Sequence, residues 1–373
     1  MSAVRIIVTG GDGFIGRNLR VRLREVGHTD VVSVTRATRA DTLHAALRNA
    51  DFVFHLAGAN RPADPAELTE VNARFTATVC AALRATGRPV PIVYSSSTQA
   101  SLESPYGRSK RAGEVEVERY GSATGSRTIV LRLTNVFGKW CRPNYNSAVA
   151  TFCHNLARGL PFTVHDPGAP LRLVYIDDVV DAMIRMLDPA DIRSGLVEIG
   201  PVYGTSVGEV AGMLQEFAES RRTLTIPRVG AGLTRALYST YVSYLPPEQF
   251  AYDLRGHADL RGIFVEMLRT LDSGQFSYFT APPGVTRGEH YHHSKTEKFL
   301  VVKGTARFGF RHVVTDETFE IIVGGEASRV VETVPGWAHN ITNVGAEEMV
   351  VLLWANEVFD PQKPDTIASA VNP

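Results

Sequence analysis

The stretch Gly284-Val-Thr-Arg-Gly-Glu-His-Tyr-His-His-Ser-Lys-Thr-Glu-Lys-Phe-Leu-Val-Val-Lys-Gly304 decides how the C-terminal part of this chain folds. Its histidines His290 and His292 are two residues apart, so on an extended strand both imidazoles project from the same face. Glu297 follows after an interval that one turn closes, and His339 offers a fourth ligand beside another short strand. Three imidazoles and one carboxylate form a ligand set that proteins use to bind divalent metals. The spacing therefore predicts a metal site within a β-rich domain.

The alternative is a histidine-rich surface loop on a β domain that binds no metal. Two nearby histidines alone would favour that alternative, whereas four ligands at full spacing favour the metal site. The ligand set suits Zn, Fe, Ni or Mn. We rank Zn first, because it is redox-silent and the chemistry argued below needs no redox metal.

The same stretch resembles the first motif of the cupin family, G-x5-H-x-H-x4-E-x6-G, and fits it at each position. The segment from Pro335 to His339 is similar to the second motif, although Pro335 lies one residue closer to the histidine than is usual. The resemblance implies a jelly-roll barrel of antiparallel strands.

Arg287-Gly288-x-His290, together with Lys298, also resembles the dTDP-sugar 3,5-epimerase branch of the cupins. In that branch a histidine removes a proton next to a ketone while a lysine stabilises the enolate, so the resemblance implies a catalytic role for Lys298. A metal-bound His290 is not free to act as that base. We favour the ligand role for His290 and leave the base unassigned.

Length and composition describe an ordinary globular protein. A chain of 373 residues suggests two domains. The 39 basic and 39 acidic residues cancel, so neither a nucleic acid nor a membrane surface is the expected partner. Cys80, Cys141 and Cys153 are odd in number and have no CxxC spacing, which favours a reducing compartment. The chain starts directly with a strand, so we expect no signal peptide and a cytoplasmic location.

The N-terminal segment has the pattern of a strand, a glycine-rich turn and a helix. The β-branched run Val4 to Val8 leads into a turn of spaced glycines, and apolar residues at helical spacing follow. Such a turn lets the backbone approach a pyrophosphate at the helix N-terminus. A later strand from Asp51 to Ala57 ends at the same crevice of an open α/β sheet. The predicted cofactor contacts are Gly10, Asp12, Gly13, Phe14, Ile15, Gly16, Leu56 and Ala57, together with Arg36, Tyr106 and Lys110 further along the chain.

The residue after the second predicted strand indicates which dinucleotide binds. That strand, Val31 to Val34, ends in Thr35-Arg36, where an NAD-preferring unit would place an acidic residue on the ribose. Arg36 instead suits a 2′-phosphate. The sequence therefore predicts NADPH, the alternative being that Arg36 is a solvated surface residue.

A third pattern supplies acid–base groups. Tyr106 and Lys110 are four residues apart and share one face of a predicted helix, so the ammonium can lower the pKa of the phenol. They follow the strand that runs into Ser95-Ser96-Ser97. Together with the turn, this set resembles the extended short-chain dehydrogenase/reductase family. The resemblance implies catalytic roles for Ser97, Tyr106 and Lys110, with Ser96 as the alternative serine.

Further residues follow from the same family resemblance. It implies that Asn135 lies beside the nicotinamide and the substrate phosphates, and that Arg172 precedes a segment that closes over the diphosphate. The pair Pro246-Pro247 marks the predicted boundary between domains 1–246 and 247–373. The predicted fold is a Rossmann-like doubly wound sheet followed by an all-β barrel.

The whole chain resembles bifunctional enzymes of bacterial capsule synthesis on the UDP-N-acetyl-L-fucosamine pathway. The resemblance implies C3 epimerisation of UDP-2-acetamido-2,6-dideoxy-L-lyxo-hexos-4-ulose in the barrel. NADPH-dependent reduction at C4 would then give the L-talose sugar. One alternative is a 4-ketoreductase whose metal-binding barrel only mediates dimerisation, and another is an Fe(II) oxygenase fused to a reductase. Because cupin barrels often pair through their edges, we expect a homodimer.

Overall fold

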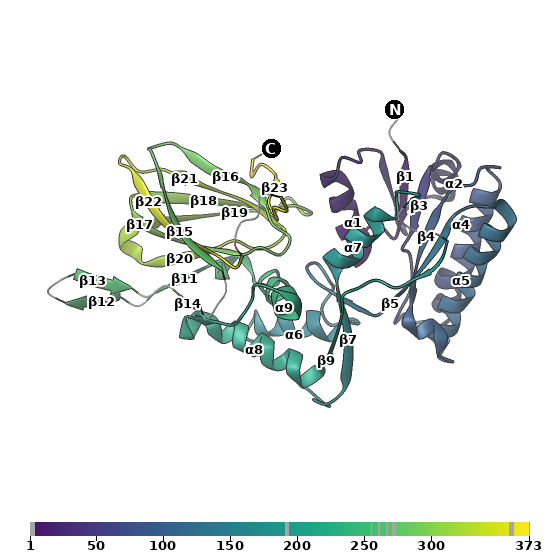
Figure 1. The fold of residues 1–373 in the computed structure, drawn as a ribbon, viewed down its shortest axis with the longest axis horizontal. Helices are drawn as coiled ribbons and strands as arrows, with labels where there is room; N and C mark the ends of the chain where they lie inside the picture. The colour runs from purple at the N-terminus through teal and green to yellow at the C-terminus, as the bar shows by residue number, and fades with distance from the viewer. Residues whose placement is uncertain are drawn as a thin grey trace. The chain divides into compact units, whose positions relative to one another are not determined.

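The computed structural model describes residues 4–190, 194–254, 256–259, 262–265, 268–270, 274–357 and 362–372. The chain divides into two compact units, one made of residues 1–147 and 171–204 and the other of residues 148–170 and 205–373. A parallel sheet with helices forms the first unit, and antiparallel sheets with three helices form the second (Figure 1). This confirms the predicted fold class, a Rossmann-like unit followed by a cupin-like β domain.

The main sheet of the first unit has the strand order β2-β1-β3-β4-β5-β8, and its described pairs are parallel. Its strands are β1 (Ile6–Thr9), β2 (Val31–Val34), β3 (Phe52–His55), β4 (Ile92–Ser97), β5 (Thr128–Leu133) and β8 (Gly195–Val197). The order changes direction between β1 and β3, where Thr9 pairs with His55 at the carboxyl ends. Open α/β sheets bind their ligands at such a switch point.

Helices pack on both faces of this sheet because its strands are apolar on both sides. Helices α1 (Phe14–Glu25) and α7 (Ile176–Arg185) pack together on one face. Helix α4 (Phe75–Arg84) packs with α2 (Ala40–Arg48) and α5 (Pro105–Thr124) on the other (Figure 1). Short elements complete the unit: α3 (Ala66–Thr69), a π-helical turn Glu70–Arg74, β6 (Asn135–Phe137), β7 (Pro170–Tyr175) and β9 (Val202–Ser206).

The second unit contains two five-stranded antiparallel sheets. One has the order β11 (Ala251–Asp253), β20 (Arg329–Glu332), β17 (Glu297–Lys303), β22 (Met349–Ala355), β15 (Gln275–Ala281). The other has the order β19 (Thr318–Gly324), β18 (Thr305–His312), β21 (Trp337–Asn343), β16 (Thr286–Tyr291), β23 (Ile367–Ala368). Phe299 on β17 and Phe308 on β18 are in ring contact, with centroids 5.7 Å apart, so the two sheets share an aromatic core. Two small ladders pair β10 (Thr225–Ile226) with β14 (Arg269–Thr270) and β12 (Gly256–Asp259) with β13 (Gly262–Val265).

Three helices that precede the predicted domain boundary belong to the second unit: α6 (Ala148–Leu156), α8 (Val207–Thr223) and α9 (Gly232–Val242). Arg221 of α8 and Tyr238 of α9 both bond the carboxylate of Glu332 on β20. By packing, these helices group with the antiparallel sheets, whereas the boundary expected after residue 246 separates them from those sheets.

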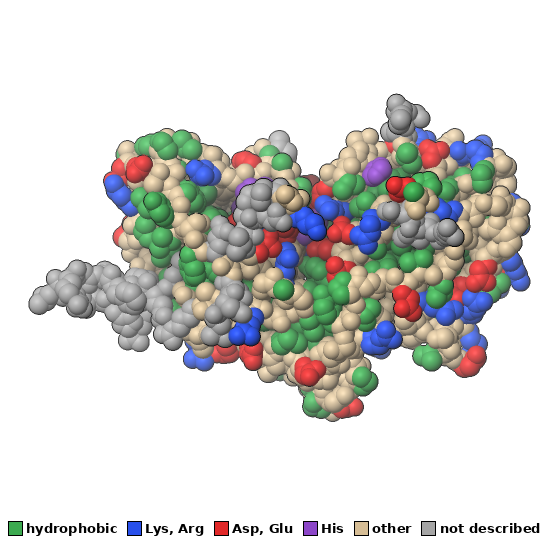
Figure 2. Space-filling model, viewed as in Figure 1, with side chains coloured by type: hydrophobic (Ala, Val, Ile, Leu, Met, Phe, Trp, Pro, Cys, Tyr) green, Lys and Arg blue, Asp and Glu red, His purple; other side chains and the backbone are tan. Residues whose placement is uncertain are grey.

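Charged side chains of both signs are interspersed on the face drawn in Figure 2, as the balanced composition leads us to expect. None of the helices formed by the described residues combines the length and the apolar run needed to cross a bilayer.

Candidate active sites

The glycine turn between β1 and α1 brings the predicted cofactor contacts together. Gly10 has a φ of +67°, and a side chain there would place its Cβ 2.7 Å from the backbone nitrogen of Ala57. A Cβ on Gly16 would lie 2.3 Å from the carbonyl oxygen of Gly10. Both positions therefore require glycine. Helix α1 starts at Phe14 with no side-chain cap and no acidic residue in its first turn, which suits an anion at its N-terminus.

Arg36 lies just beyond β2 and its side chain is 82% exposed. Its guanidinium forms an ion pair of 2.5 Å with Glu67. The position at the carboxyl end of β2 is the one predicted for contact with the adenosine ribose.

The two serines at the end of β4 have different partners. Ser96 donates to the buried carboxylate of Glu114 at 2.5 Å and so points away from Tyr106. Ser97 interacts with the Tyr106 phenol and acts to lower its pKa. The different partners of the two serines favour Ser97 as the serine of this site.

Tyr106 does not have the lowered pKa that the sequence predicts. Burial raises the pKa of Tyr106, and the hydrogen bond with Ser97 acts in the opposite direction without offsetting it. The phenol is therefore protonated at neutral pH and can act as a proton donor.

Lys110 projects from α5 into the sheet rather than into solvent. Its residue is 4% exposed, and Nζ donates to the carbonyl oxygen of Ser95 at 2.7 Å. Burial lowers the pKa of Lys110 to about 8, while Glu114 acts to raise it. The ammonium is thus held next to the strand that carries Ser97.

Sequence reasoning missed Asn72, a fully buried amide within the π-helical turn. Its side chain accepts from the backbone nitrogen of Ala59 at 2.9 Å and donates to Ala59 oxygen at 2.8 Å and to Ser109 Oγ at 3.0 Å. Asn72 therefore ties the loop after β3 to the helix that carries Tyr106 and Lys110. Other polar and charged residues surround Asn72 in the sequence, so no local pattern distinguishes it.

Asn135 and Arg172 lie on neighbouring strands, since Asn135 at the start of β6 pairs with Leu173 of β7. Both residues are exposed, and Thr134 donates to the carbonyl oxygen of Arg172 at 2.7 Å. The two predicted substrate contacts therefore lie on adjacent strands, one residue out of register.

The second site is a compact cluster of His290, His292, Glu297 and His339. Their ligand atoms lie within 4.8 Å of one another. His290 of β16 pairs in register with His339 of β21, and the ring centroids are 4.7 Å apart. Glu297 Oε2 lies 3.2 Å from His292 Nε2 and 3.6 Å from His339 Nε2. The structure therefore brings together all four predicted metal ligands.

Hydrogen bonds at Nδ1 of His292 and His339 fix the direction in which Nε2 of each ring points. Nδ1 of His292 bonds the carbonyl oxygen of Asp365, and Nδ1 of His339 lies 3.4 Å from that of Trp337. A carbonyl can only accept, so each Nδ1 carries a proton, and Nε2 on the other side of each ring faces the Glu297 carboxylate. A proton shared by His292 and Glu297 would still leave the buried Nε2 of His339 without a partner. A cation satisfies all of these groups at once, so the residues fit a divalent metal.

The pKa shifts of the cluster residues also fit a divalent metal site. Burial, with the neighbouring His339 and His292, lowers the pKa of His290 to about 4. Burial also lowers the pKa of His339. Burial acts to raise the pKa of Glu297. Contacts with His292 and His339 and the charge of Lys295 act more strongly and hold that pKa well below its usual range. At neutral pH, His290 and His339 are neutral and Glu297 is ionised, as metal ligands must be.

Lys298 is not in this cluster. It follows Glu297 on β17, so its side chain points to the opposite face, where it forms an ion pair with Glu332. Burial would lower the pKa of Lys298, but the Glu332 carboxylate more than offsets this and raises it. The lysine that reaches the cluster is Lys295, whose Nζ lies 2.7 Å from Glu297 Oε1. The structure therefore does not support the enolate-stabilising role predicted for Lys298.

Known proteins resemble this chain over one or both units. The NAD dependent epimerase/dehydratase family matches residues 6–200, and the polysaccharide biosynthesis C-terminal domain matches residues 257–367. The UDP-2-acetamido-2,6-beta-L-arabino-hexul-4-ose reductase of Pseudomonas aeruginosa is 54% identical over 368 residues, which cover 99% of each chain.

Two solved structures are also similar. The capsular polysaccharide assembling protein CapF from Staphylococcus aureus has a TM-score of 0.69 at 40% identity, covering 98% of this chain and 100% of that one. MoeE5 in complex with UDP-glucuronic acid and NAD has a TM-score of 0.50 at 26% identity, covering 56% of this chain and 80% of that one.

Proposed function

The chain belongs to the NAD dependent epimerase/dehydratase family, and on this premise we propose that it is a bifunctional nucleotide-sugar enzyme of capsular polysaccharide synthesis. The second unit epimerises C3 of a UDP-linked 2-acetamido-2,6-dideoxy 4-keto sugar, and the first unit then reduces the ketone at C4. The observation that carries this proposal is that one chain, similar over its full length to a 4-keto sugar reductase, also holds a converging His/Glu cluster.

The stereochemistry of the two ketones supports an epimerisation before reduction. The relative's name gives an L-arabino ketone, whereas the resemblance to capsule enzymes implied the L-lyxo ketone as the sugar that is epimerised. These two sugars differ only at C3. L-talose has the same configuration as the L-lyxo ketone at C2, C3 and C5. We therefore propose that C3 epimerisation converts the L-arabino ketone into the L-lyxo ketone, which makes the L-lyxo ketone the product of that step and not its substrate as first expected. Reduction of the L-lyxo ketone then gives UDP-2-acetamido-2,6-dideoxy-L-talose.

In the first unit, the residues of β4 and α5 handle the C4 oxygen. Tyr106 is protonated and donates its proton to the oxygen as the ketone becomes an alcohol, while Ser97 holds the phenol and the oxygen in place. Lys110 orients the nicotinamide side of the site. Asn135 and Arg172 bind the sugar nucleotide. NADPH, when bound, supplies the hydride.

In the second unit, the ketone at C4 acidifies the proton at C3. A divalent cation held by His290, His292, Glu297 and His339 supplies, when bound, positive charge next to the enolate oxygen. Lys295 places a second positive charge beside Glu297. Because His290 is a metal ligand, the base that removes the C3 proton must be a different group, which we leave unassigned.

We also propose the finer assignments that the sequence suggests. The cofactor is NADPH rather than NADH, because Arg36 stands where a 2′-phosphate would lie. The metal is Zn, because its chemistry is redox-silent. The protein is located in the cytoplasm. It forms a homodimer, and sedimentation of the purified chain would check that oligomeric state.

Hydrogen exchange at C3 tests the epimerase half. The chain, the L-arabino ketone and D₂O are incubated without NADPH, and deuterium at C3 is measured by NMR. We expect exchange that a chelator abolishes and added Zn²⁺ restores. Absence of exchange would leave a reductase with a non-catalytic module, and iron-dependent O₂ consumption would favour an oxygenase.

A further inference from the structure

The C-terminal segment from Asp365 to Val371 lies against the strand and the loop that carry two of the four cluster residues. Strand β23 pairs with β16 so that Ala368 is opposite His290 and Ile367 is opposite Tyr291. The backbone nitrogen of Ser369 donates to the carbonyl oxygen of Glu289 at 2.9 Å. We name residues 365–371 the C-terminal strap.

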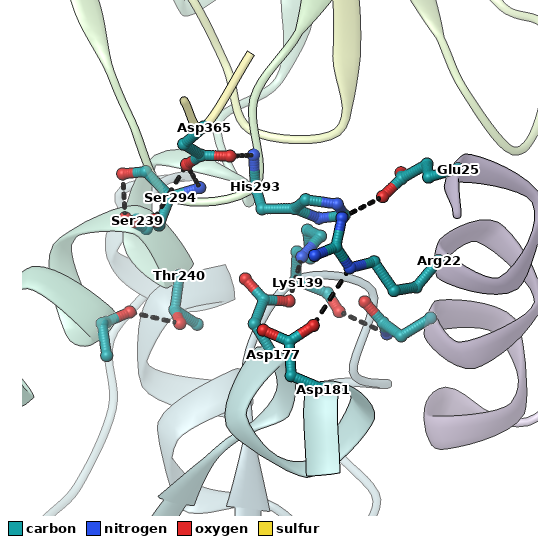
Figure 3. Close-up of polar contacts among 12 residues, drawn as sticks. Arg22, Glu25, Lys139, Asp177, Asp181, Ser239, Thr240, His293, Ser294 and Asp365 are labelled. Carbon is teal, nitrogen blue, oxygen red and sulfur yellow. Dashed lines mark hydrogen bonds and ion pairs between the residues drawn. The ribbon is translucent and has the colours of Figure 1, made fainter. Parts of the chain in front are cut away.

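Asp365, at the start of the strap, binds the loop between His292 and Glu297. Its carboxylate accepts from the backbone nitrogens of His293 at 2.9 Å, Ser294 at 2.7 Å and Lys295 at 2.7 Å. The hydroxyl of Ser294 is a fourth donor at 2.9 Å. Figure 3 shows Asp365 beside Ser294 and the backbone of His293, with Ser239 on the other side of Ser294. One carboxylate therefore fixes three consecutive residues of the loop.

The backbone of Asp365 contacts a ligand ring directly. Its carbonyl oxygen accepts from Nδ1 of His292, and this contact turns Nε2 on the other side of the ring toward Glu297 Oε2, 3.2 Å away. An outer partner of this kind fixes the tautomer and the orientation of a metal-ligating imidazole.

The far end of the strap holds the bulge before His290. Glu289 has a φ of +58°, and the register of β16 against β21 shifts between Gly288 and His290. The Glu289 carboxylate accepts from Asn340 Nδ2 at 2.7 Å and from the backbone nitrogen of Val371 at 2.8 Å. A bulge changes the direction of the side chains beside it, so these hydrogen bonds of Glu289 set the direction of His290.

We propose that the C-terminal strap positions the His/Glu cluster, with Asp365 as its principal positioning residue. Asp365 is not among the four converging ligands, and its carboxylate is occupied by the loop nitrogens. It acts by holding His292 and the loop to Glu297 in the geometry that a cation requires. This inference rests on the proposed metal-dependent function of the second unit.

The test compares Zn²⁺ affinity in full-length chains by competition with a chromophoric chelator. Asp365→Ala leaves the three loop nitrogens without their acceptor, so we expect a roughly 10- to 100-fold loss of affinity. The control Asp253→Ala removes a carboxylate that is 72% exposed on β11 of the same unit, and should bind Zn²⁺ as the wild type does. Asp365→Asn keeps the size of the side chain and one acceptor oxygen, and should give an intermediate loss.

A spectroscopic readout separates positioning from general stability. At saturating Co²⁺, the visible absorption bands of Asp365→Ala should differ from those of the wild type and of Asp253→Ala, because the ligand geometry changes. Wild-type affinity and wild-type bands in Asp365→Asn and Asp365→Ala would overturn the proposal. If Asp365→Ala does not fold, Asp365→Asn decides alone. Failure of the wild type itself to bind Zn²⁺ would instead count against the proposed function.

Discussion

The two candidate sites are built in opposite ways. The first takes most of its groups from short sequence segments, a glycine turn and one strand–helix pair, and its chemistry depends on where protons lie on Tyr106 and Lys110. The second collects its ligands from separate strands and the loop between them, and its lone pairs converge on one point. A change at either site should therefore act on one reaction and spare the other. Each prediction below tests or refines that separation.

The largest effect is expected at the proton donor. Tyr106→Phe removes the hydroxyl that protonates the C4 oxygen, so NADPH oxidation with the L-lyxo ketone should fall by roughly 10²- to 10⁴-fold. C3 exchange should remain at the wild-type rate. Loss of exchange in a folded Tyr106→Phe protein would mean that the two reactions share a site.

The reverse result is expected at the cluster. His339→Ala removes a ligand whose Nε2 is buried and faces Glu297, so Zn²⁺ affinity should fall by more than the roughly 10- to 100-fold typical of lost outer partners. C3 exchange should fall to background. NADPH oxidation with the L-lyxo ketone supplied directly should be unchanged, and a matching loss there would contradict the separation.

The third prediction concerns the buried charges behind the cluster. Glu332 bonds both Lys298 and Arg221, so Glu332→Gln leaves two cations without their partner and should destabilise the second unit by about 3–5 kcal/mol. Fluorescence of Trp337 and Trp354 should report an earlier unfolding transition in urea. Glu320→Gln, at an exposed ion pair, is the control and should change stability by less than about 0.5 kcal/mol. Equal stability of the two variants would refute the structural role given to Lys298.

A smaller effect is expected at the cofactor ribose. Arg36→Ala removes the cation proposed to meet the 2′-phosphate, so KM for NADPH should rise by roughly tenfold, or about 1.4 kcal/mol. KM for NADH serves as the internal control and should not change. Equal use of NADH and NADPH by the wild type would show that the assignment of Arg36 is wrong.

The smallest effect is expected in the pH dependence of reduction. Burial lowers the pKa of Lys110 to about 8, so the orienting ammonium is lost as pH rises through that value. The value of kcat/KM for the L-lyxo ketone, which reports the free enzyme, should fall to about half by pH 8. Lys110→Arg should move the fall to higher pH, and an identical profile in that variant would assign the titration to another group.

Much of both sites could be predicted from the sequence because most of the deciding residues are close together in it, His339 being the exception. The glycine turn and the ligand spacing each reflect local backbone geometry. The sequence prediction put Lys298 in the epimerase site, although the sequence itself already indicates that Lys298 faces away from Glu297. Glu297 and Lys298 are successive residues of one strand, and alternation sends them to opposite faces.

Other features depend on contacts that the sequence does not encode locally. Asp365 lies far along the chain from the loop it binds, and only the pairing of β23 with β16 brings it there. The helices α8 and α9 contact the second unit through Arg221 and Tyr238, which both bond Glu332 far along the chain. Burial reversed the expected pKa shift of Tyr106, since the depth of a side chain follows from tertiary packing.

Sequential incubation tests the two-site account most directly. The L-arabino ketone is first treated with Tyr106→Phe in D₂O, that protein is removed, and His339→Ala with NADPH is then added in H₂O. The account predicts UDP-2-acetamido-2,6-dideoxy-L-talose carrying deuterium at C3. Formation of that product only when both sites are intact on one chain would contradict it.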